Sequence, residues 1–402
     1  MPAYSGRYQY LDEAGATLHQ GPCQLKFEDG TCIVTPAGAT PLAFDLGDVD
    51  RTVPAEYDLQ LVLYTGRTVV LKQFGAVFSR MAGELLAAWR DRTVECMLLE
   101  DLEEIARYDG AANGVPAEIR IFRSNLAIIP LTGLPSQWRL AEIESCTFDD
   151  AAYSIVLQSA GERLVLSKLA KKTDEAFGTL RQALDALQTH AAETLRELFP
   201  FLNADALQRF HQAMPEGRSC AMTALSAIHP KLPIALRDHT VDETLAPYVR
   251  ELGARSIAAP FGGFKFTSGL EAPAEPEADA ETAPATETPP LFFWYFFPLR
   301  NNIVAWEATT GTGRATYFFR CEGPIEACVA QITRGLALVN FRREPVYLPD
   351  ASLEEQPRYH RYAIGARKLP DLRALRAKYL GRAIHSSLEN WLTQVVSITG
   401  EA

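Results

Sequence analysis

The chain of 402 residues contains no apolar run long enough to cross a membrane. Its longest strongly apolar stretch is LFFWYFFPL, residues 291–299, whereas a transmembrane helix needs roughly 20 apolar residues. The N-terminal sequence also lacks a basic start followed by an apolar segment, so we expect no secretory signal. Both absences favour a cytoplasmic protein.

Cysteine pairs at metal- or redox-type spacing are absent as well. The seven cysteines are odd in number and scattered, and no CxxC occurs. In a chain of this length the pattern predicts reduced thiols in a cytoplasm. Cys321 and Cys328 are seven positions apart, and we expect them to be small buried hydrophobic residues rather than a redox pair.

Motifs of the major enzyme classes are also missing. The chain has no GxxxxGK[ST], GxGxxG, HExxH or GxSxG pattern. The glycine pairs at 262–263 and 311–313 are therefore predicted to be turns. No catalytic residue, cofactor or metal site is predicted from these patterns.

Histidine offers only one weak grouping. His229 and His239 lie in the same irregular region, so a zinc site or an acid–base pair there is an alternative to ordinary surface or capping histidines. We favour the ordinary role, because neither residue belongs to a ligand motif.

Composition describes a packed protein with an acidic balance. Hydrophobic residues make up 47% and charged residues 22%, which is ordinary for a globular chain of two to four domains. The net charge of −11 argues against general attraction to nucleic acid or an anionic membrane. The abundance of Ala, Arg and Leu is typical of high-GC bacterial genomes.

An internal repeat is the clearest feature. The segments that start at Gly21 and Gly114 share the order of apolar, turn and proline positions at an offset of 94, with Leu25 matching Ile119, for example. Few residues are identical. The repeat of the pattern predicts that one small fold occurs twice in the first 190 residues.

Each copy contains several short strands followed by one helix. Leu59, Leu61 and Leu63 alternate with other residues, as in a half-buried strand. Apolar residues then recur every three or four positions between Phe74 and Trp89, as in an amphipathic helix. In element order both copies, residues 5–95 and 105–190, resemble pleckstrin-homology-like (PH-like) domains.

The resemblance implies a bent sheet that forms a half-open barrel, capped by its C-terminal helix. It also implies binding of phosphoinositides or of peptides. Lipid-binding members carry basic residues around the first hairpin, whereas residues 6–30 offer only Arg7 and Lys26. We therefore do not expect phosphoinositide binding, and the resemblance favours a protein or peptide partner.

The predicted fold class is α+β, with two PH-like half-open barrels and a separate α+β C-terminal domain. Between them we expect a helical connector and an acidic linker that contains no basic residue and no core. The predicted boundaries are 1–95, 96–200, 201–270 (connector), 271–290 (linker) and 291–402.

The C-terminal domain is predicted to contain three strands and two helices. The strands lie at 292–299, 303–309 and 315–320, and the helices run over 324–338 and about 370–396. Since LFFWYFFPL has no polar alternation, we expect an internal strand buried on both faces. The helices would cover one face. The other face would be covered by another helix, by the N-terminal repeats or by a second chain. A second chain would make the protein a homodimer through this domain.

An acidic cluster of DxxDxD spacing follows the third strand-like segment of the first copy. Carboxylates at this spacing are hard ligands for a divalent cation. The second copy, however, has an arginine at one matching position, which opposes a cation. We favour an acidic turn between two strands. The residues are Asp45, Asp48 and Asp50, matched by Arg139, Glu142 and Glu144.

Basic residues are concentrated near the C-terminus, where one acid, Asp371, stands among eight of them. Such a face is a candidate for binding an anion or an acidic partner. The alternative, which we favour, is a solvated helix face or a face that docks on the acidic half of the same chain. The eight are Arg358, Arg361, Arg367, Lys368, Arg373, Arg376, Lys378 and Arg382.

From these features we expect a non-enzymatic binding or scaffold protein with a protein or peptide partner. One alternative is an enzyme with its site in the connector or the C-terminal domain, using His229, His239 and the arginines. A second is peripheral membrane or nucleic-acid association through the basic C-terminal segment, although the net charge of −11 opposes nucleic acid as a partner.

Overall fold

A computed structural model describes residues 3–38, 40–99, 103–131, 133–159, 161–266, 291–309 and 315–400. The predicted linker at 271–290 and the predicted turn at 311–313 lie outside these residues. The chain forms two compact units. The first comprises residues 1–139, 144–181 and 350–369, and the second comprises 140–143, 182–349 and 370–402.

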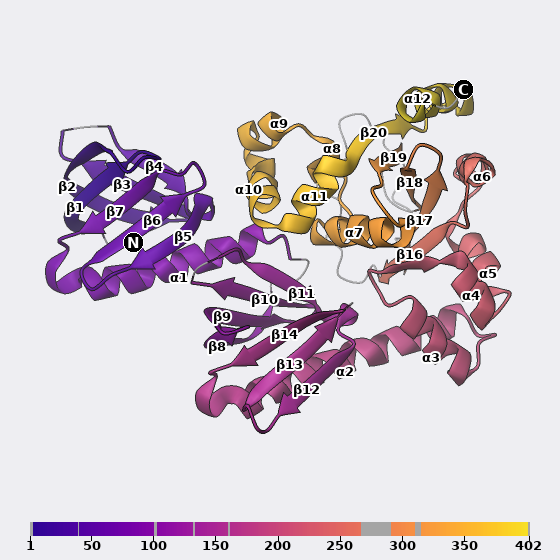
Figure 1. Cartoon of the computed structure of the whole chain (residues 1–402), viewed down its shortest axis with the longest axis horizontal. Coiled ribbons are helices and arrows are strands. Elements are labelled where there is room, and N and C mark those ends of the chain that lie inside the picture. Colours follow the sequence, from indigo (N-terminus) through magenta and orange to yellow (C-terminus); the bar gives the residue numbers. More distant parts are fainter. Residues whose placement is uncertain are drawn as a thin grey trace. The chain divides into compact units, whose positions relative to one another are not determined.

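The first unit begins with a curled, seven-stranded antiparallel sheet A of strand order β4-β3-β2-β1-β7-β6-β5 (Figure 1). A helix, α1, follows and packs on the sheet through the buried stripe Phe78, Met81, Leu85 and Trp89. Together they form the first module. Its elements are β1 (Tyr4–Leu11), β2 (Thr17–Glu28), β3 (Thr31–Pro36), β4 (Leu42–Asp45), η1 (Leu46–Asp48), β5 (Val49–Pro54), β6 (Asp58–Leu63), β7 (Thr68–Lys72), η2 (Gly75–Val77) and α1 (Phe78–Cys96).

A second seven-stranded sheet, sheet B, repeats this order as β11-β10-β9-β8-β14-β13-β12 and is also followed by a helix. The two copies therefore share one strand order, as the repeat of the pattern predicts. The second module comprises β8 (Glu104–Ala112), β9 (Val115–Phe122), β10 (Asn125–Pro130), β11 (Ser136–Arg139), η3 (Leu140–Glu142), β12 (Ser145–Asp149), β13 (Ser154–Ser159), β14 (Glu162–Ser167), η4 (Ala170–Lys172) and α2 (Thr173–Leu198).

The second unit is built on a six-stranded antiparallel sheet C, ordered β15-β16-β17-β18-β19-β20. Its first two strands come from the stretch that the sequence assigns to a connector, so this stretch shares a sheet with the C-terminal part. The strands are β15 (Ser219–Ala221), β16 (Phe261–Phe266), β17 (Leu291–Leu299), β18 (Ile303–Ala308), β19 (Ala315–Arg320) and β20 (Tyr379–Ile384).

The prediction of a turn at residues 262–263 is wrong, because both glycines lie inside β16. Aromatic rings of the neighbouring strand occupy the space where side chains would stand. A Cβ at Gly263 would lie 2.4 Å from Cζ2 of Trp294, and one at Gly262 would lie 2.7 Å from Cζ of Phe293. The glycines thus serve close packing rather than chain reversal.

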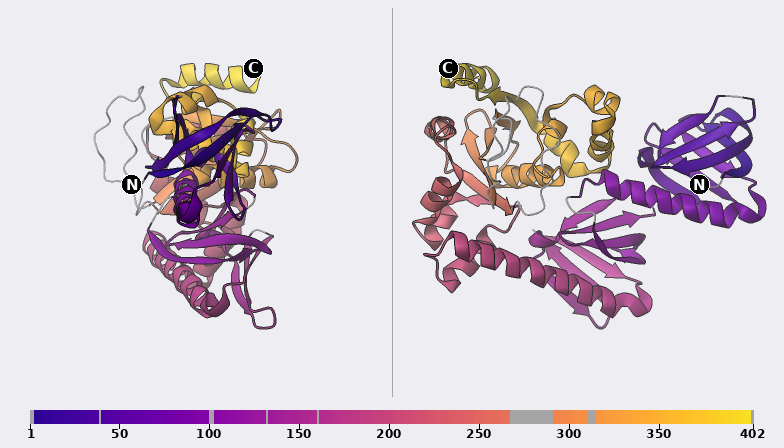
Figure 2. Two further views of the ribbon diagram at one scale, coloured as in Figure 1. Left: turned by 90° about the vertical axis from the view of Figure 1, so that its left-hand side faces the viewer. Right: turned by 180° about the vertical axis from the view of Figure 1, so that it is seen from behind.

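Helices flank sheet C on both sides: α7 and α11 lie on one side, and α4, α5 and α6 on the other (Figures 1 and 2). Besides the C-terminal part of α2, from residue 182, this unit contains α3 (Ala204–Ala213), α4 (Met222–Ile228), α5 (Leu232–Thr240), α6 (Ala246–Arg255), α7 (Ile325–Leu338), α8 (Glu344–Tyr347), α11 (Pro370–Lys378) and α12 (Leu388–Thr399). No helix of the described residues combines the length and apolarity needed to span a membrane.

The predicted long helix over 370–396 is wrong. The chain forms α11, then the edge strand β20, and then α12. Helical spacing of apolar residues continues through this stretch, but Tyr379–Ile384 pairs with β19 instead. A tertiary pairing partner therefore overrides the local pattern.

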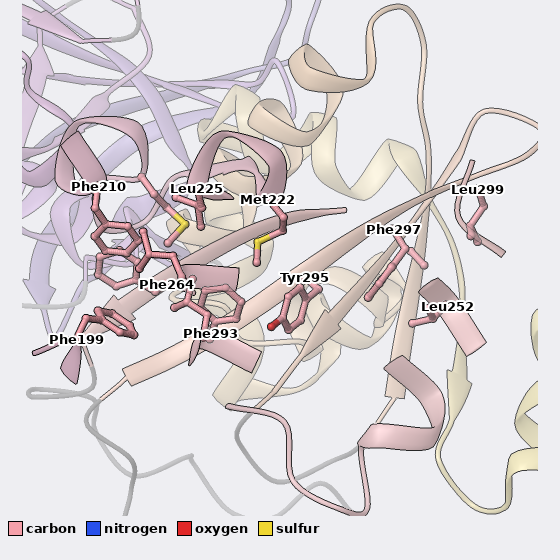
Figure 3. Packing of buried hydrophobic residues seen from close by; sticks show 14 of the residues in the cluster. Phe199, Phe210, Met222, Leu225, Leu252, Phe264, Phe293, Tyr295, Phe297 and Leu299 are labelled. Carbon is pink, nitrogen blue, oxygen red and sulfur yellow. The ribbon is translucent and has the colours of Figure 1, made fainter. Parts of the chain in front are cut away.

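The strand β17 is internal, as its unbroken apolar sequence predicts. It pairs with β16 on one side and β18 on the other. Phe293, Tyr295 and Phe297 belong to the core cluster shown in Figure 3 together with residues of α3–α6 and α12. The Trp294 ring packs 4.1 Å from that of Phe341, and Phe296 is fully buried.

Cys321 and Cys328 form a disulfide between the end of β19 and the start of α7. The prediction that all seven cysteines are free thiols is therefore wrong for this pair. The sequence suggests no pairing because the two residues belong to different elements, and the turn at Gly323–Pro324 brings them together. The other five cysteines form no disulfide.

Candidate functional site

The acidic turn, residues 45–50, connects β4 to β5 through η1, so its predicted place between two strands is confirmed. Asp45 begins the short helix by accepting a hydrogen bond from the amide of Gly47 at 2.7 Å. The same carboxylate receives two hydrogen bonds from the Arg92 guanidinium of α1, at 2.9 and 2.6 Å. This bidentate pair fixes the turn against α1.

A helical segment from far along the chain docks on this turn. We name residues 350–369 the arm; it contains α9 (Asp350–Glu355), η5 (Pro357–Tyr359) and α10 (His360–Lys368). Although both neighbours of the arm in sequence belong to the second unit, the arm itself belongs to the first. The first module therefore holds a segment that is remote in sequence.

The arm's contacts begin with Arg367. Its guanidinium donates to Asp48 of the acidic turn and to Glu354 of the arm itself. It also stacks 3.9 Å from the centroid of the Tyr64 ring. Burial raises the pKa of the Asp48 carboxyl, and Arg367 opposes that rise. The arginine thus stabilises a carboxylate that burial would otherwise disfavour.

Lys368 is the more deeply buried of the two cations that the arm brings to the acidic turn, with a 3% exposed side chain. Its ammonium donates to the carbonyl oxygen of Val49 at 2.7 Å and lies 3.6 Å from the Asp50 carboxylate. The indole of Trp89 donates to the same carbonyl at 3.0 Å. Burial lowers the pKa of Lys368, and Asp50 opposes that shift. A cation with so little water depends on these oxygens.

Apolar contacts complete the docking. A Cβ at Gly47 would lie 2.9 Å from Cδ1 of Ile364, which is fully buried, so glycine is needed for this approach. On the arm, a Cβ at Gly365 would meet Leu98 at 2.9 Å and the Cys96 carbonyl oxygen at 3.0 Å. The arm and the module therefore approach each other at glycines on both sides.

His360 adds an ionisable group to the contact. Its Nε2 lies 3.9 Å from Asp45 and its Nδ1 lies 3.7 Å from Glu354. The acidic turn thus faces Arg92 from its own module and His360, Arg367 and Lys368 from the arm. Its carboxylates meet three cations of this chain, Arg92, Arg367 and Lys368.

The eight predicted basic residues divide between the two units. Arg358, Arg361, Arg367 and Lys368 belong to the first, and Arg373, Arg376, Lys378 and Arg382 to the second. Several are engaged within their unit: Arg376 donates to the carbonyls of Pro345 and Leu348, and Arg382 stacks on Tyr347 at 3.9 Å.

Arg367 and Lys368 make the internal contact with acidic residues that the sequence left open as an alternative. Arg358 and Arg361 lie near tyrosine rings of the arm, those of Tyr359 and Tyr362. An anion-binding face made of all eight residues stays a prediction.

A buried polar cluster lies on the core face of sheet C. Thr316 donates to Glu307 at 2.6 Å, and His385 Nε2 lies 3.3 Å from Glu307 and 3.1 Å from the Thr316 hydroxyl. The Trp391 indole donates to Thr316 at 2.9 Å, and the Tyr248 ring stacks on His385 at 4.0 Å. The Nδ1 atom of His385 is buried without a hydrogen-bond partner.

This cluster differs from a nucleophile–histidine–carboxylate triad. In a triad the hydroxyl and the carboxylate use opposite ring nitrogens. Here Glu307 and Thr316 both approach Nε2 of His385. The cluster is therefore suited to holding β18, β19 and the start of α12 together, and its geometry does not activate the Thr316 hydroxyl.

His229 and His239, the two histidines of the predicted connector, each pack against a phenylalanine ring. His229 lies 5.0 Å from the Phe201 ring and accepts a hydrogen bond from the amide of Lys231, while His239 packs against Phe199. Across the described residues, no three His, Cys, Asp or Glu side chains gather as a metal site.

The free cysteine closest to the docked arm is not activated as a nucleophile. Burial raises the pKa of the Cys96 thiol to about 12, so it is protonated at neutral pH.

Comparison with protein-family models finds no family that matches, and comparison with curated proteins finds no similar sequence. The site must therefore be judged from its own geometry.

Sequence reasoning identified the acidic turn and the basic segment but missed their partners Arg92, His360 and Glu354. No local sequence pattern indicates these three residues. Arg92 and His360 contact carboxylates that are distant in sequence, and Glu354 lies in a helix with no distinctive motif. The Glu307–His385 contact was also missed, since 78 positions separate the two residues.

Proposed function

We propose that the chain is a binding or scaffold protein whose two modules are PH-like domains that take protein segments as partners. A bent, half-open sheet capped by one amphipathic helix is the arrangement that the PH-like resemblance implies. Two observations support the proposal: sheets A and B share one strand order, and each is followed by a helix. In such an arrangement the sheet is a rigid platform, and its turns and edges are available to partners.

The observation that carries the proposal is the docked arm. The first module already holds a helical segment through Arg367, Lys368 and Ile364. These contacts combine an ion pair, a buried cation and an apolar anchor, which are the elements of helix recognition at protein interfaces. A module that binds a helix of its own chain has a surface suited to helices of other proteins.

The experiment is crosslinking of the full-length chain in a lysate of its natural source, with carbodiimide joining carboxylates to lysines. We expect intermolecular crosslinks that map to the two modules, residues 3–99 and 103–181, and a partner that rebinds in purified form. Crosslinks confined to the chain itself, together with turnover of a small molecule by the purified protein, would refute the proposal.

A second candidate function is an enzyme with its site in the second unit. The observation that favours it is the buried His385, whose Nδ1 has no hydrogen-bond partner. If this nitrogen takes part in chemistry, His385→Gln abolishes turnover while the protein stays folded. Activity that survives this substitution removes the candidate.

A further inference from the structure

We propose that the acidic turn of the first module is a receptor for a basic amphipathic helix, and that the arm is a resident ligand that such a helix displaces. The inference rests on the proposed binding function and names the chemistry of the partner. The partner resembles the arm: it carries an apolar residue followed by an arginine and a lysine at the end of a helix.

The acidic turn and the arm are complementary in charge. Asp45, Asp48 and Asp50 form one edge of the contact, and α10 ends in Arg367 and Lys368. Cations at the C-terminal end of a helix also complement its dipole, whose negative end lies there. A second basic helix that ends in an arginine and a lysine would meet the same three carboxylates.

The two surfaces also fit each other in shape. Ile364 lies one turn before Lys368 on α10, so the two residues share a face of the helix. Gly47 leaves the space that Ile364 fills, and the Val49 carbonyl receives the lysine. The receptor thus specifies an apolar residue and a lysine four positions later, with the arginine between them aimed at Asp48.

The arm is attached in a way that allows it to detach. Its connections to the second unit begin at Pro349 and Pro370, on either side of the docked residues. Much of its attachment is ionic and only partly buried: the side chain of Arg367 is 22% exposed and that of Asp48 is 16% exposed. Contacts of this kind are weakened by salt and contribute modestly, whereas a competing helix has to match the buried contacts of Ile364 and Lys368.

The test uses the full-length chain and a fluorescent peptide of residues 350–369. In the wild type the arm occupies the receptor and the peptide binds weakly. Ile364→Asp places a charge against Gly47, releases the arm and leaves the receptor unchanged. We expect this variant to bind the peptide at least about tenfold more tightly in fluorescence anisotropy, because occupied sites lower apparent affinity.

Matched variants define the site. Adding Asp48→Arg to the Ile364→Asp chain should abolish the gain, because the arginine of the peptide then meets a like charge. Arg358→Glu is the control, since its observed contacts, with Gln356 and Tyr359, lie within the arm; it should bind like the wild type. Arg367→Glu replaces Ile364→Asp if circular dichroism shows that the latter is unfolded.

Hydrogen exchange of residues 360–368 measures the release of the arm. Faster exchange with tighter peptide binding supports the proposal. Faster exchange without peptide binding shows that the turn is not a receptor, and unchanged exchange shows that the arm is a fixed part of the module; either refutes the proposal. A dimer of the released variant in light scattering would make a second copy the occupant and would also refute it.

The proposed function can fail separately. If crosslinking captures no partner but the peptide binds the released chain, the receptor exists and serves the arm alone. If partners are captured but the peptide does not bind, the modules bind proteins by another surface.

Discussion

The strand β17 and the docked arm are held in place by different forces. β17 buries five consecutive residues, Phe293–Phe297, between two neighbouring strands and two helical layers. The arm is held by Arg367 and Lys368 on carboxylate and carbonyl oxygens and by the buried side chain of Ile364. The comparison teaches that the second unit is stabilised by apolar burial, whereas the arm's attachment to the first module is adjustable by charge.

The largest effect is expected in β17. Phe296→Ala should lower the free energy of unfolding by about 3–5 kcal/mol, because it leaves a cavity where a fully buried ring stood. Urea unfolding at low and high salt measures this loss, which should not depend on salt. Tyr57→Ala, at a 68% exposed residue, is the control and should change stability by less than about 0.5 kcal/mol.

The disulfide should contribute the next largest effect. Replacing Cys321 and Cys328 by serine should cost about 2–3 kcal/mol, because the bond closes only a short loop in the unfolded chain. Thermal unfolding with and without reductant measures it. The double variant should not respond to reductant, whereas the wild type should; equal responses would contradict the bond's contribution.

A smaller loss is expected at the glycine that faces Trp294. Gly263→Ala should cost about 1–3 kcal/mol, since its Cβ would lie 2.4 Å from the indole ring. Gly21→Ala is the matched control, because Gly21 is also a strand glycine and has no atom within 4 Å of the added Cβ. Equal stability of the two variants in urea unfolding would contradict this expectation. It would show that the Trp294 ring moves to accommodate the added methyl group at little cost.

The smallest effect is expected in the arm. Lys368→Met should change stability by less than about 1 kcal/mol, because losing the contact with Val49 is offset by removing a buried charge. The effect on pH dependence is clearer. Burial lowers the pKa of Lys368 in the folded state, whereas in the unfolded chain it has the ordinary value of about 10.4. At pH values between these two pKa values, the unfolded chain therefore binds more protons than the folded chain.

The wild type should therefore gain stability from this group over that alkaline range. Lys368→Met should lose this gain, while Lys26→Met, at an exposed strand residue, should keep it. Denaturant unfolding at a series of alkaline pH values checks both variants. Identical pH profiles for Lys368→Met and the wild type would show that the ammonium is hydrated in the folded chain.

The sequence by itself determined the features that depend on neighbouring residues. Alternation at Leu59, Leu61 and Leu63 marked a strand with one buried face, and all three are buried in β6. The spacing from Phe78 to Trp89 marked the stripe of α1. The unbroken run in β17 marked a strand covered on both faces. Such patterns are local because side-chain direction repeats every 2 residues in a strand and every 3.6 in a helix.

Only the tertiary structure decided the features that depend on distant partners. Tyr379–Ile384 has helical spacing but becomes β20 because β19 offers an open edge. Gly262 and Gly263 look like a turn until the rings of β17 fill the space above them. Asp48 and Arg367 are 319 residues apart, and no pattern in either segment predicts their contact. Charges and surfaces were visible in the sequence, but their pairing depends on how the chain brings them together in space.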